Sequence, residues 1–159
     1  MPDLLYLRND RRFGNSKLNR RDWLLAAIAL SGERGLSPIQ IQKAMFLLRM
    51  EAPDAVGRQF YAFIPYDYGP FSSSIYRDLD QLVVSGLVRE KSASTNYSGY
   101  YSTEFGRQRL EPLFAEVPDD VKQYLADIVR WILSVGFTQL LRSIYAKYPD
   151  YAQNSVFRY

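Results

Sequence analysis

The chain has 159 residues, 47% hydrophobic and 15% aromatic, enough apolar side chain to build the core of one domain. It contains no cysteine and no histidine, which excludes disulfides, cysteine nucleophiles, histidine bases and nearly all zinc sites. We therefore expect a protein that is not an enzyme and that holds neither a cofactor nor a metal.

The net charge of +3 is concentrated at the start of the chain, because residues 1–22 contain six basic and three acidic side chains whereas the remainder contains fourteen of each sign. These 22 residues are predicted to form a basic arm, either contacting DNA phosphates or acting only as a solubilising leader. The arm does not resemble a signal peptide, and no apolar stretch is long enough to span a bilayer. A cytoplasmic location without membrane contact is expected.

Two helices are predicted after the arm. Residues 22–32 are apolar on most sides, which indicates a buried helix ending near Gly32. Ser37 and Pro38 suit the cap and first position of a second helix, which ends before Pro53. In this second helix the side chains expected inside are Ile39, Ile41, Ala44, Met45, Leu47 and Leu48, and those expected outside are Gln40, Gln42, Lys43 and Arg49.

A strand or extended segment is predicted over residues 60–66, followed by a turn at Gly69 and Pro70. Apolar residues at helical spacing then predict a third helix from the serines at 72–74 to Gly86. Residues 87–91 and 100–103 predict a β-hairpin. The order helix, turn, helix, hairpin indicates a winged helix-turn-helix in which the hairpin is the wing.

Three more helices are predicted near the C-terminus: one from Thr103 with a kink or end at Pro112, one from Asp119 to Gly136, and one over residues 138–148. The expected organisation is a basic arm (1–22), a winged helix-turn-helix core (23–116) and a helical extension packed on the same domain (117–159). The predicted fold class is α+β and mostly helical, with a β-hairpin wing and additional C-terminal helices.

Three segments carry a resemblance to known families: Ile41–Leu48 with its Gln42-Lys43 pair, Phe63–Ser72 with Tyr68-Gly69-Pro70, and Ile75–Leu79. They resemble the YwgA-like proteins and, more distantly, the Panacea domains of SocA-like antitoxins. The resemblance extends from about Ile39 to the Tyr-Pro segment at 145–155. It implies a regulatory winged helix or a toxin-neutralising module, although Phe60–Phe63 stands where a Trp-containing strand is common in Panacea domains.

One hypothesis is a non-catalytic DNA-binding regulator of transcription that contacts double-stranded DNA. Its predicted nucleic-acid-binding residues are Arg8, Arg11, Arg12, Lys17, Arg20 and Arg21 in the arm, Ser73, Ser74, Arg77 and Gln81 in the third helix, and Arg89 and Lys91 in the wing. Asp78 and Asp80, also expected on the exposed side of the third helix, oppose this hypothesis because they would face phosphates.

The alternative hypothesis is an antitoxin-like module that binds a partner protein. It rests on the neutral body of the chain and on its thirteen tyrosines, a residue type favoured in interfaces. Tyr66, Tyr68, Phe71 and Tyr76 cluster around the Gly-Pro turn, where packing in the core and at its rim is favoured over a pocket. The C-terminal helices could also form a homodimer.

Overall fold

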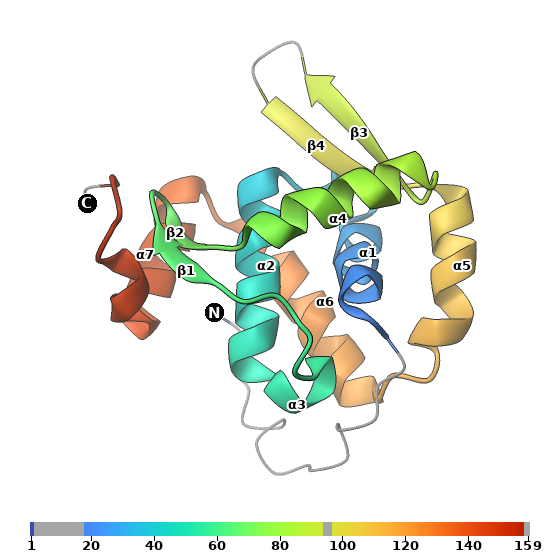
Figure 1. The fold of residues 1–159 in the computed structure, drawn as a ribbon, viewed down its shortest axis with the longest axis horizontal. Helices are drawn as coiled ribbons and strands as arrows, with labels where there is room; N and C mark the ends of the chain where they lie inside the picture. Colours follow the sequence, from blue (N-terminus) through green and yellow to red (C-terminus); the bar gives the residue numbers. More distant parts are fainter. Residues whose placement is uncertain (2–17, 94–96, 158–159) are drawn as a thin grey trace.

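The computed structural model describes Met1, residues 18–93 and residues 97–157. These residues form an α+β fold that is mostly helical (Figure 1), which confirms the expected class at this level. The α-helices are α1 (Arg20–Leu30), α2 (Pro38–Glu51), α3 (Pro53–Val56), α4 (Ser73–Val84), α5 (Glu104–Phe114), α6 (Asp119–Ser134) and α7 (Phe137–Lys147). The strands are β1 (Ile64–Tyr66), β2 (Gly69–Phe71), β3 (Val88–Ala93) and β4 (Tyr97–Ser102), and the 3-10 helices are η1 (Gly32–Arg34) and η2 (Pro149–Ala152).

Capping side chains set the start of the first two long helices. Asn19 accepts from the backbone of Asp22, whose carboxylate accepts from the Asn19 backbone, so α1 begins two residues before the predicted start. Ser37 and Gln40 make the same reciprocal pair at α2, with Pro38 at its first position. These bonds satisfy backbone N–H groups that have no partner inside a helix.

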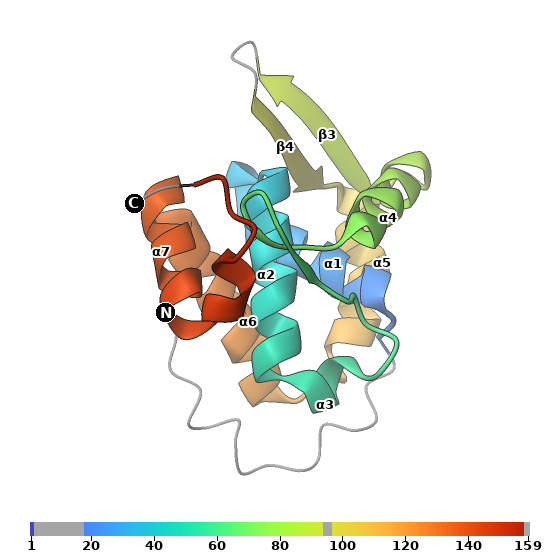
Figure 2. The ribbon, with the colours of Figure 1, turned by 60° about the vertical axis from the view of Figure 1, so that its left-hand side comes forward.

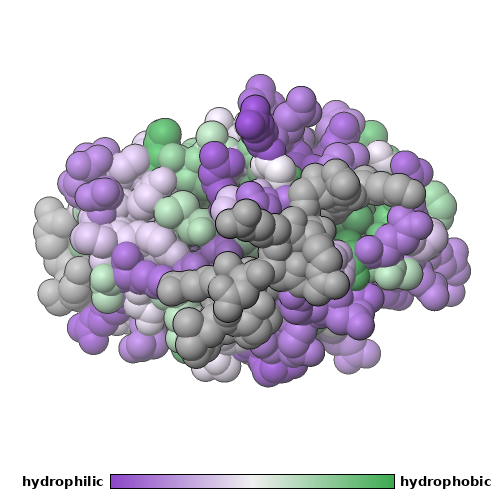
Figure 3. All heavy atoms as spheres, turned by 90° about the horizontal axis from the view of Figure 1, so that it is seen from below, coloured by the Kyte–Doolittle hydropathy of each residue, from purple (hydrophilic) through white to green (hydrophobic). Residues whose placement is uncertain are grey.

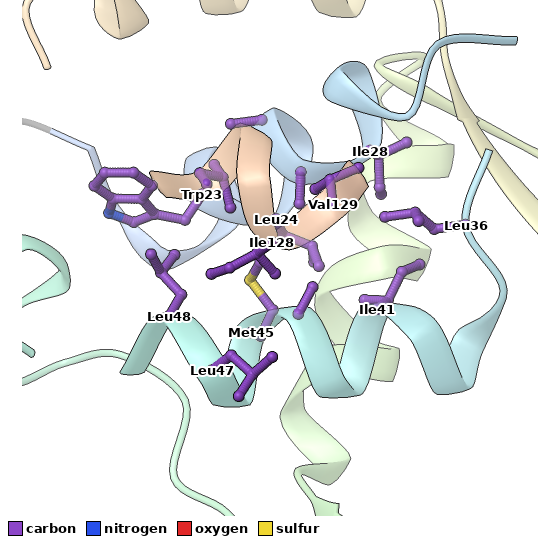
Figure 4. Packing of buried hydrophobic residues seen from close by; sticks show 14 of the residues in the cluster. Trp23, Leu24, Ile28, Leu36, Ile41, Met45, Leu47, Leu48, Ile128 and Val129 are labelled. Carbon is purple, nitrogen blue, oxygen red and sulfur yellow. The ribbon is translucent and has the colours of Figure 1, made fainter. Parts of the chain in front are cut away.

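The core forms where α1, α2 and α6 meet (Figure 4). Fully buried side chains include Trp23 from α1, Met45 from α2 and Ile128 from α6. The spacing of apolar residues in α6 predicts a stripe of six inward-facing side chains. Five of them are buried (Val121, Leu125, Ile128, Val129 and Ile132) and Leu133 is half-buried, so α6 contributes to the same hydrophobic cluster as the first two helices.

The β3–β4 hairpin follows α4 directly, as predicted, although both strands are longer than expected. Val88 lies opposite Ser102 and Ala93 lies opposite Tyr97. Leu36, just before α2, pairs with Tyr100: Leu36 N donates to Tyr100 O (3.1 Å) and Tyr100 N donates to Leu36 O (2.9 Å). The hairpin is thereby fixed to the segment that connects α1 and α2.

The β1–β2 hairpin lies between α3 and α4, beside α7 and η2 (Figure 2). The predicted strand over residues 60–66 is only partly confirmed, because pairing is limited to Ile64–Tyr66 against Gly69–Phe71. Pro65 lies opposite Pro70, and proline has no N–H to extend a ladder of hydrogen bonds. The segment after η2 binds the turn of this hairpin, since Val156 N donates to Asp67 O (2.9 Å).

Gly106 brings α5 against the link between α4 and β3. A Cβ at this position would lie 2.1 Å from Leu87 O, so no other residue fits without a shift. Thr103 caps α5 by accepting from Gly106 N (2.9 Å) and donates its own hydroxyl to Gly86 O (2.6 Å). Pro112 neither ends α5 nor splits it into two helices.

Candidate functional site

Gln42 and Lys43 anchor the segment that precedes α4. Gln42 Nε2 donates to Ser72 O (2.9 Å), and Ser72 N donates to Gln42 Oε1 (2.8 Å). Lys43 Nζ donates to Pro70 O (3.1 Å). The side chains of α2 thus provide residues 70–72 with the hydrogen bonds that a neighbouring strand would otherwise provide.

The prediction that Gln42 and Lys43 point outward was wrong, since each is only 2% exposed. Polar side chains can be buried when their hydrogen bonds are satisfied, and the aliphatic stem of lysine packs well against apolar neighbours. Burial lowers the pKa of the Lys43 amine to about 7. The Gln-Lys and Gly-Pro motifs that carry the family resemblance therefore contact each other in the interior.

Asp78 lies on the inner side of α4, where it joins α1 to the segment after α3. Tyr61 donates its hydroxyl to Asp78 Oδ2 (2.6 Å), and Arg20 Nε donates to the same oxygen (2.9 Å). Burial and the Asp78 carboxylate raise the pKa of Tyr61 well above its usual range, so its hydroxyl stays protonated as the donor. The Arg20 guanidinium also stacks over the Tyr61 ring, 5.0 Å from its centroid.

This network corrects one sequence-based expectation. Asp78 was expected on the exposed side of α4 but is buried, because Arg20 and Tyr61 supply the hydrogen bonds that its carboxylate needs. Arg20 pairs with Asp78, and its contact with DNA phosphates stays a prediction. For Tyr61 the sequence offered only an indirect signal: it lies in an apolar segment, and a tyrosine buried there needs a hydrogen-bond partner for its hydroxyl.

The outer side of α4 carries the other residues predicted to contact DNA bases. Ser73, Arg77 and Gln81 are exposed and Ser74 is half-buried. Arg77 Nη2 donates to Ser74 Oγ (3.2 Å). Asp80 is exposed on the same helix, so the two surface charges of α4 cancel.

The charged residues of β3 alternate between the two faces of its hairpin, as strand geometry requires. Arg89 and Lys91 share a face with Tyr101, and together with Glu33 and Arg107 they line a hollow beside η1 and α5. Glu90 lies on the opposite face. There burial, followed by the charges of Glu90 and Asp80, raises the pKa of Tyr100 to about 12. The basic residues predicted for the hairpin therefore lie away from α4.

A cluster of apolar and aromatic residues, most of them exposed, lies on the β1–β2 hairpin, on α4 and on α7. Tyr66 stacks on Phe71 (centroids 4.9 Å apart), and Phe71 contacts Tyr76 of α4 (5.9 Å). Tyr68 meets Phe137 of α7 edge-on (5.6 Å). We define the aromatic surface as these five residues and Ile64. Its tyrosines were expected in the core or at its rim; Tyr66 is 48% exposed and Tyr76 39% exposed, so neither lies in the core.

A groove lies between the start of α1 and the segment after α3. It has a volume of about 800 Å³ and is lined by residues 18–21, residues 56–60 and Asp78. We call it the arginine groove, because Arg20, Arg21 and Arg58 line it against the single carboxylate of Asp78. Four of the residues predicted to bind nucleic acid, Arg8, Arg11, Arg12 and Lys17, lie outside the described residues.

Other candidate sites were sought over residues 18–93 and 97–157. This part of the chain holds no group of carboxylates arranged to bind a metal ion, and it has no helix with the length and hydrophobicity that crossing a bilayer requires. No protein-family model matches the chain, and no curated protein matches it in sequence.

Proposed function

We propose that this chain is a non-catalytic winged-helix module that binds a partner protein through the aromatic surface. In the proposed fold, α2 and α4 are the two helices of the helix-turn-helix, and β3–β4 is the wing. The pairing of Leu36 with Tyr100 supports this fold, because it adds a third extended segment to the hairpin beside the helices. The β1–β2 hairpin is then an insertion between the two helices.

The exposed aromatic surface is the observation that carries the proposal. Ile64, Tyr66 and Tyr68 are each exposed by more than 40%, and they are contributed by one short hairpin. Ring contacts join Tyr66, Phe71 and Tyr76 in one group and Tyr68 and Phe137 in another. Exposed apolar residues that touch one another mark interaction sites more often than scattered ones do. Tyrosine suits such a site, since its ring supplies contact area and its hydroxyl can pair at the rim.

The charges beside the aromatic surface define the chemistry of the partner. Asp67 lies in the turn between Tyr66 and Tyr68, and Asp80 follows Tyr76 by one helical turn. Both are exposed, as is Glu90 on the hairpin face toward α4, whereas Arg77 is the basic residue of α4. The complementary partner carries an apolar patch bordered by lysine or arginine.

The same charges disfavour DNA as the ligand of α4. A helix placed in the major groove lies between two rows of phosphates, and binding there depends on cations that replace counterions. Carboxylates at Asp80 and Glu90 would be repelled by those phosphates. The exposed charge on this side of the molecule therefore favours the protein hypothesis over the DNA hypothesis.

Co-purification from the cells that make the protein tests the proposal. We expect the tagged full-length chain to recover one partner in stoichiometric amount, and Tyr66→Ala with Tyr76→Ala to lose it. Phe105→Ala is the matched control, because Phe105 is an exposed aromatic residue on α5, outside the aromatic surface. Recovery of the chain alone, or equal recovery by the double variant, would refute a protein partner at this surface.

DNA binding remains the second candidate, favoured by one observation. Lys91 Nζ lies 5.3 Å from the Tyr101 ring centroid on the hairpin face that also carries Arg89, and basic residues beside an aromatic ring can contact phosphates and stack on bases. The test is duplex binding at several salt concentrations. Arg89→Ala with Lys91→Ala should weaken affinity and flatten its salt dependence. If no duplex is retarded at low salt, this candidate fails.

A further inference from the structure

We propose that the arginine groove binds a phosphate-bearing small molecule of nucleotide size. This site is separate from the aromatic surface and does not depend on the proposed function. The groove is lined by the start of α1, the segment after α3 and Asp78 of α4. The helix α3 lies at the lower end of the molecule in Figure 1, and Figure 3 shows many hydrophilic residues on the described surface around the grey atoms. A volume of about 800 Å³ is large enough to hold a mononucleotide.

An excess of guanidinium groups gives the groove its preference for anions. Arg20, Arg21 and Arg58 face one carboxylate, Asp78, and Arg20 already neutralises it through two donated hydrogen bonds. Neither Arg21 nor Arg58 forms an ion pair with any carboxylate in the described residues. Two arginine charges in the groove are therefore available to an anionic ligand.

A neighbouring hollow adds one more arginine and one carboxylate. It has a volume of about 660 Å³, shares Val56, Gly57 and Arg58 with the groove, and adds Arg49 and Asp54. Arg49 Nη1 donates to Tyr61 O (2.9 Å), which holds its side chain beside the segment that follows α3. All four cations around the two hollows are arginines, whose planar donor groups match the oxygens of a phosphate in a bidentate arrangement.

The remaining lining explains why a nucleotide fits better than inorganic phosphate alone. Val56 and Phe60 are apolar lining residues of the groove, and Gln59 supplies a side-chain amide. An apolar wall can hold the flat face of a base, while an amide can donate to and accept from its edge. The arginines would then hold the phosphate at one end and these residues the base at the other.

Asp78 orients the groove and is not expected to touch the ligand. Its carboxylate accepts from Tyr61 and Arg20, so it presents little uncompensated negative charge to an incoming anion. In return it fixes the guanidinium of Arg20 in one direction. We assign Arg21 and Arg58 as the ligand-binding residues, and Arg20 as the residue that neutralises Asp78 beside them.

Equilibrium dialysis of the full-length chain tests this site with adenosine 5′-monophosphate, inorganic phosphate and adenosine as probes. We expect saturable binding of the monophosphate, weaker binding of inorganic phosphate and no binding of adenosine. Arg21→Ala with Arg58→Ala should weaken binding of the monophosphate by about tenfold or more, equivalent to ~1.4 kcal/mol. Arg109→Ala, which removes an exposed arginine from α5, should leave it unchanged.

Circular dichroism of the double variant separates loss of the site from loss of the fold, and both arginines are exposed, so we expect a native spectrum. Absence of saturable binding, or equal binding by the double variant, would overturn the proposal. A short DNA duplex that displaces the monophosphate and binds more tightly would also overturn it, because the groove would then serve a nucleic-acid backbone. Tyr66→Ala with Tyr76→Ala should still bind the monophosphate, which keeps this test independent of the partner protein.

Discussion

The two sides of α4 differ in charge and in how their side chains are held. On the outer side, Tyr76 belongs to the aromatic surface, and Asp80, one helical turn further on, is exposed. On the inner side, Asp78 is buried and paired with Arg20 at the edge of the arginine groove. Two carboxylates only two residues apart thus differ in environment, since Asp80 is exposed to solvent and Asp78 organises the interior. Substitutions on the inner side should lower the stability of the fold, whereas those on the outer side should affect the proposed binding of a partner and leave stability almost unchanged.

Asp78→Ala should have the largest effect on stability. It leaves the Tyr61 hydroxyl and part of the Arg20 guanidinium without their acceptor, and removing one member of a buried ion pair costs about 3 kcal/mol. Urea denaturation followed by circular dichroism measures the loss. Asp80→Ala is the matched control on the outer side and should change stability by less than about 0.5 kcal/mol. Equal effects of the two substitutions would contradict the contrast between the two sides.

Gly106→Ala should have the second largest effect on stability, because the new Cβ would collide with Leu87 O at the link between α4 and β3. Forcing an extra methyl into a packed contact costs about 1–3 kcal/mol. Gly136→Ala is the control, since a Cβ there meets nothing within 4 Å. Thermal denaturation compares the two variants. A variant at position 106 as stable as the one at position 136 would show that α5 can move away from Leu87.

Lys43→Met should alter the pH dependence of stability. The folded chain releases the Lys43 proton near pH 7, whereas the unfolded chain holds it to about pH 10.4. Above pH 7 the unfolded state therefore binds more protons, and raising the pH favours folding. The contribution of this lysine between pH 7 and 9 is on the order of 2 kcal/mol.

Urea denaturation of both chains at several pH values in this range measures that contribution. The variant should lack the rise in stability that Lys43 causes, so the free energy of unfolding of the wild type should increase relative to that of the variant as the pH increases. Lys122→Met is a suitable control, because Lys122 pairs with the exposed carboxylate of Asp119 at the surface. A constant difference between wild type and Lys43→Met would mean that the amine stays charged inside the fold.

Tyr66→Ala and Tyr76→Ala should have the smallest effects on stability. Both side chains are substantially exposed, and the stacking of Tyr66 on Phe71 contributes about 1 kcal/mol or less. Thermal denaturation should place both variants close to the wild type, although the double variant is expected to lose the proposed partner protein. A large loss of stability would instead show that the aromatic surface is part of the structural core.

Much of the helical framework could be predicted from local signals. Ser37 with Pro38 marked the start of α2, and most of the apolar stripe of α6 is buried as its spacing predicts. What could not be predicted depends on contacts across long stretches of chain. Lys43 is buried because Pro70 lies 27 residues away in sequence to accept from it, and Asp78 is buried because Arg20 meets it from α1.

The candidate sites show the same limit. Arg21 was identified through the excess of positive charge near the start of the chain, but its neighbour in the arginine groove, Arg58, was not, since nothing local sets that residue apart. The aromatic residues around the Gly-Pro turn were recognised as a cluster, whereas their exposure was not. Composition favours tyrosines at the edge of a core, and only the pairing of β1 with β2 turns Ile64 and Tyr66 toward solvent.

The two hydrogen bonds between Gln42 and Ser72 have a consequence for local unfolding. They tie the β1–β2 hairpin to α2, while the Leu36 pair ties the β3–β4 hairpin to the connection between α1 and α2. The two hairpins therefore open by breaking different bonds. Amide hydrogen exchange should detect two independent openings: the Ser72 amide, bonded to a side chain, should report the first, and the Tyr100 amide should report the second.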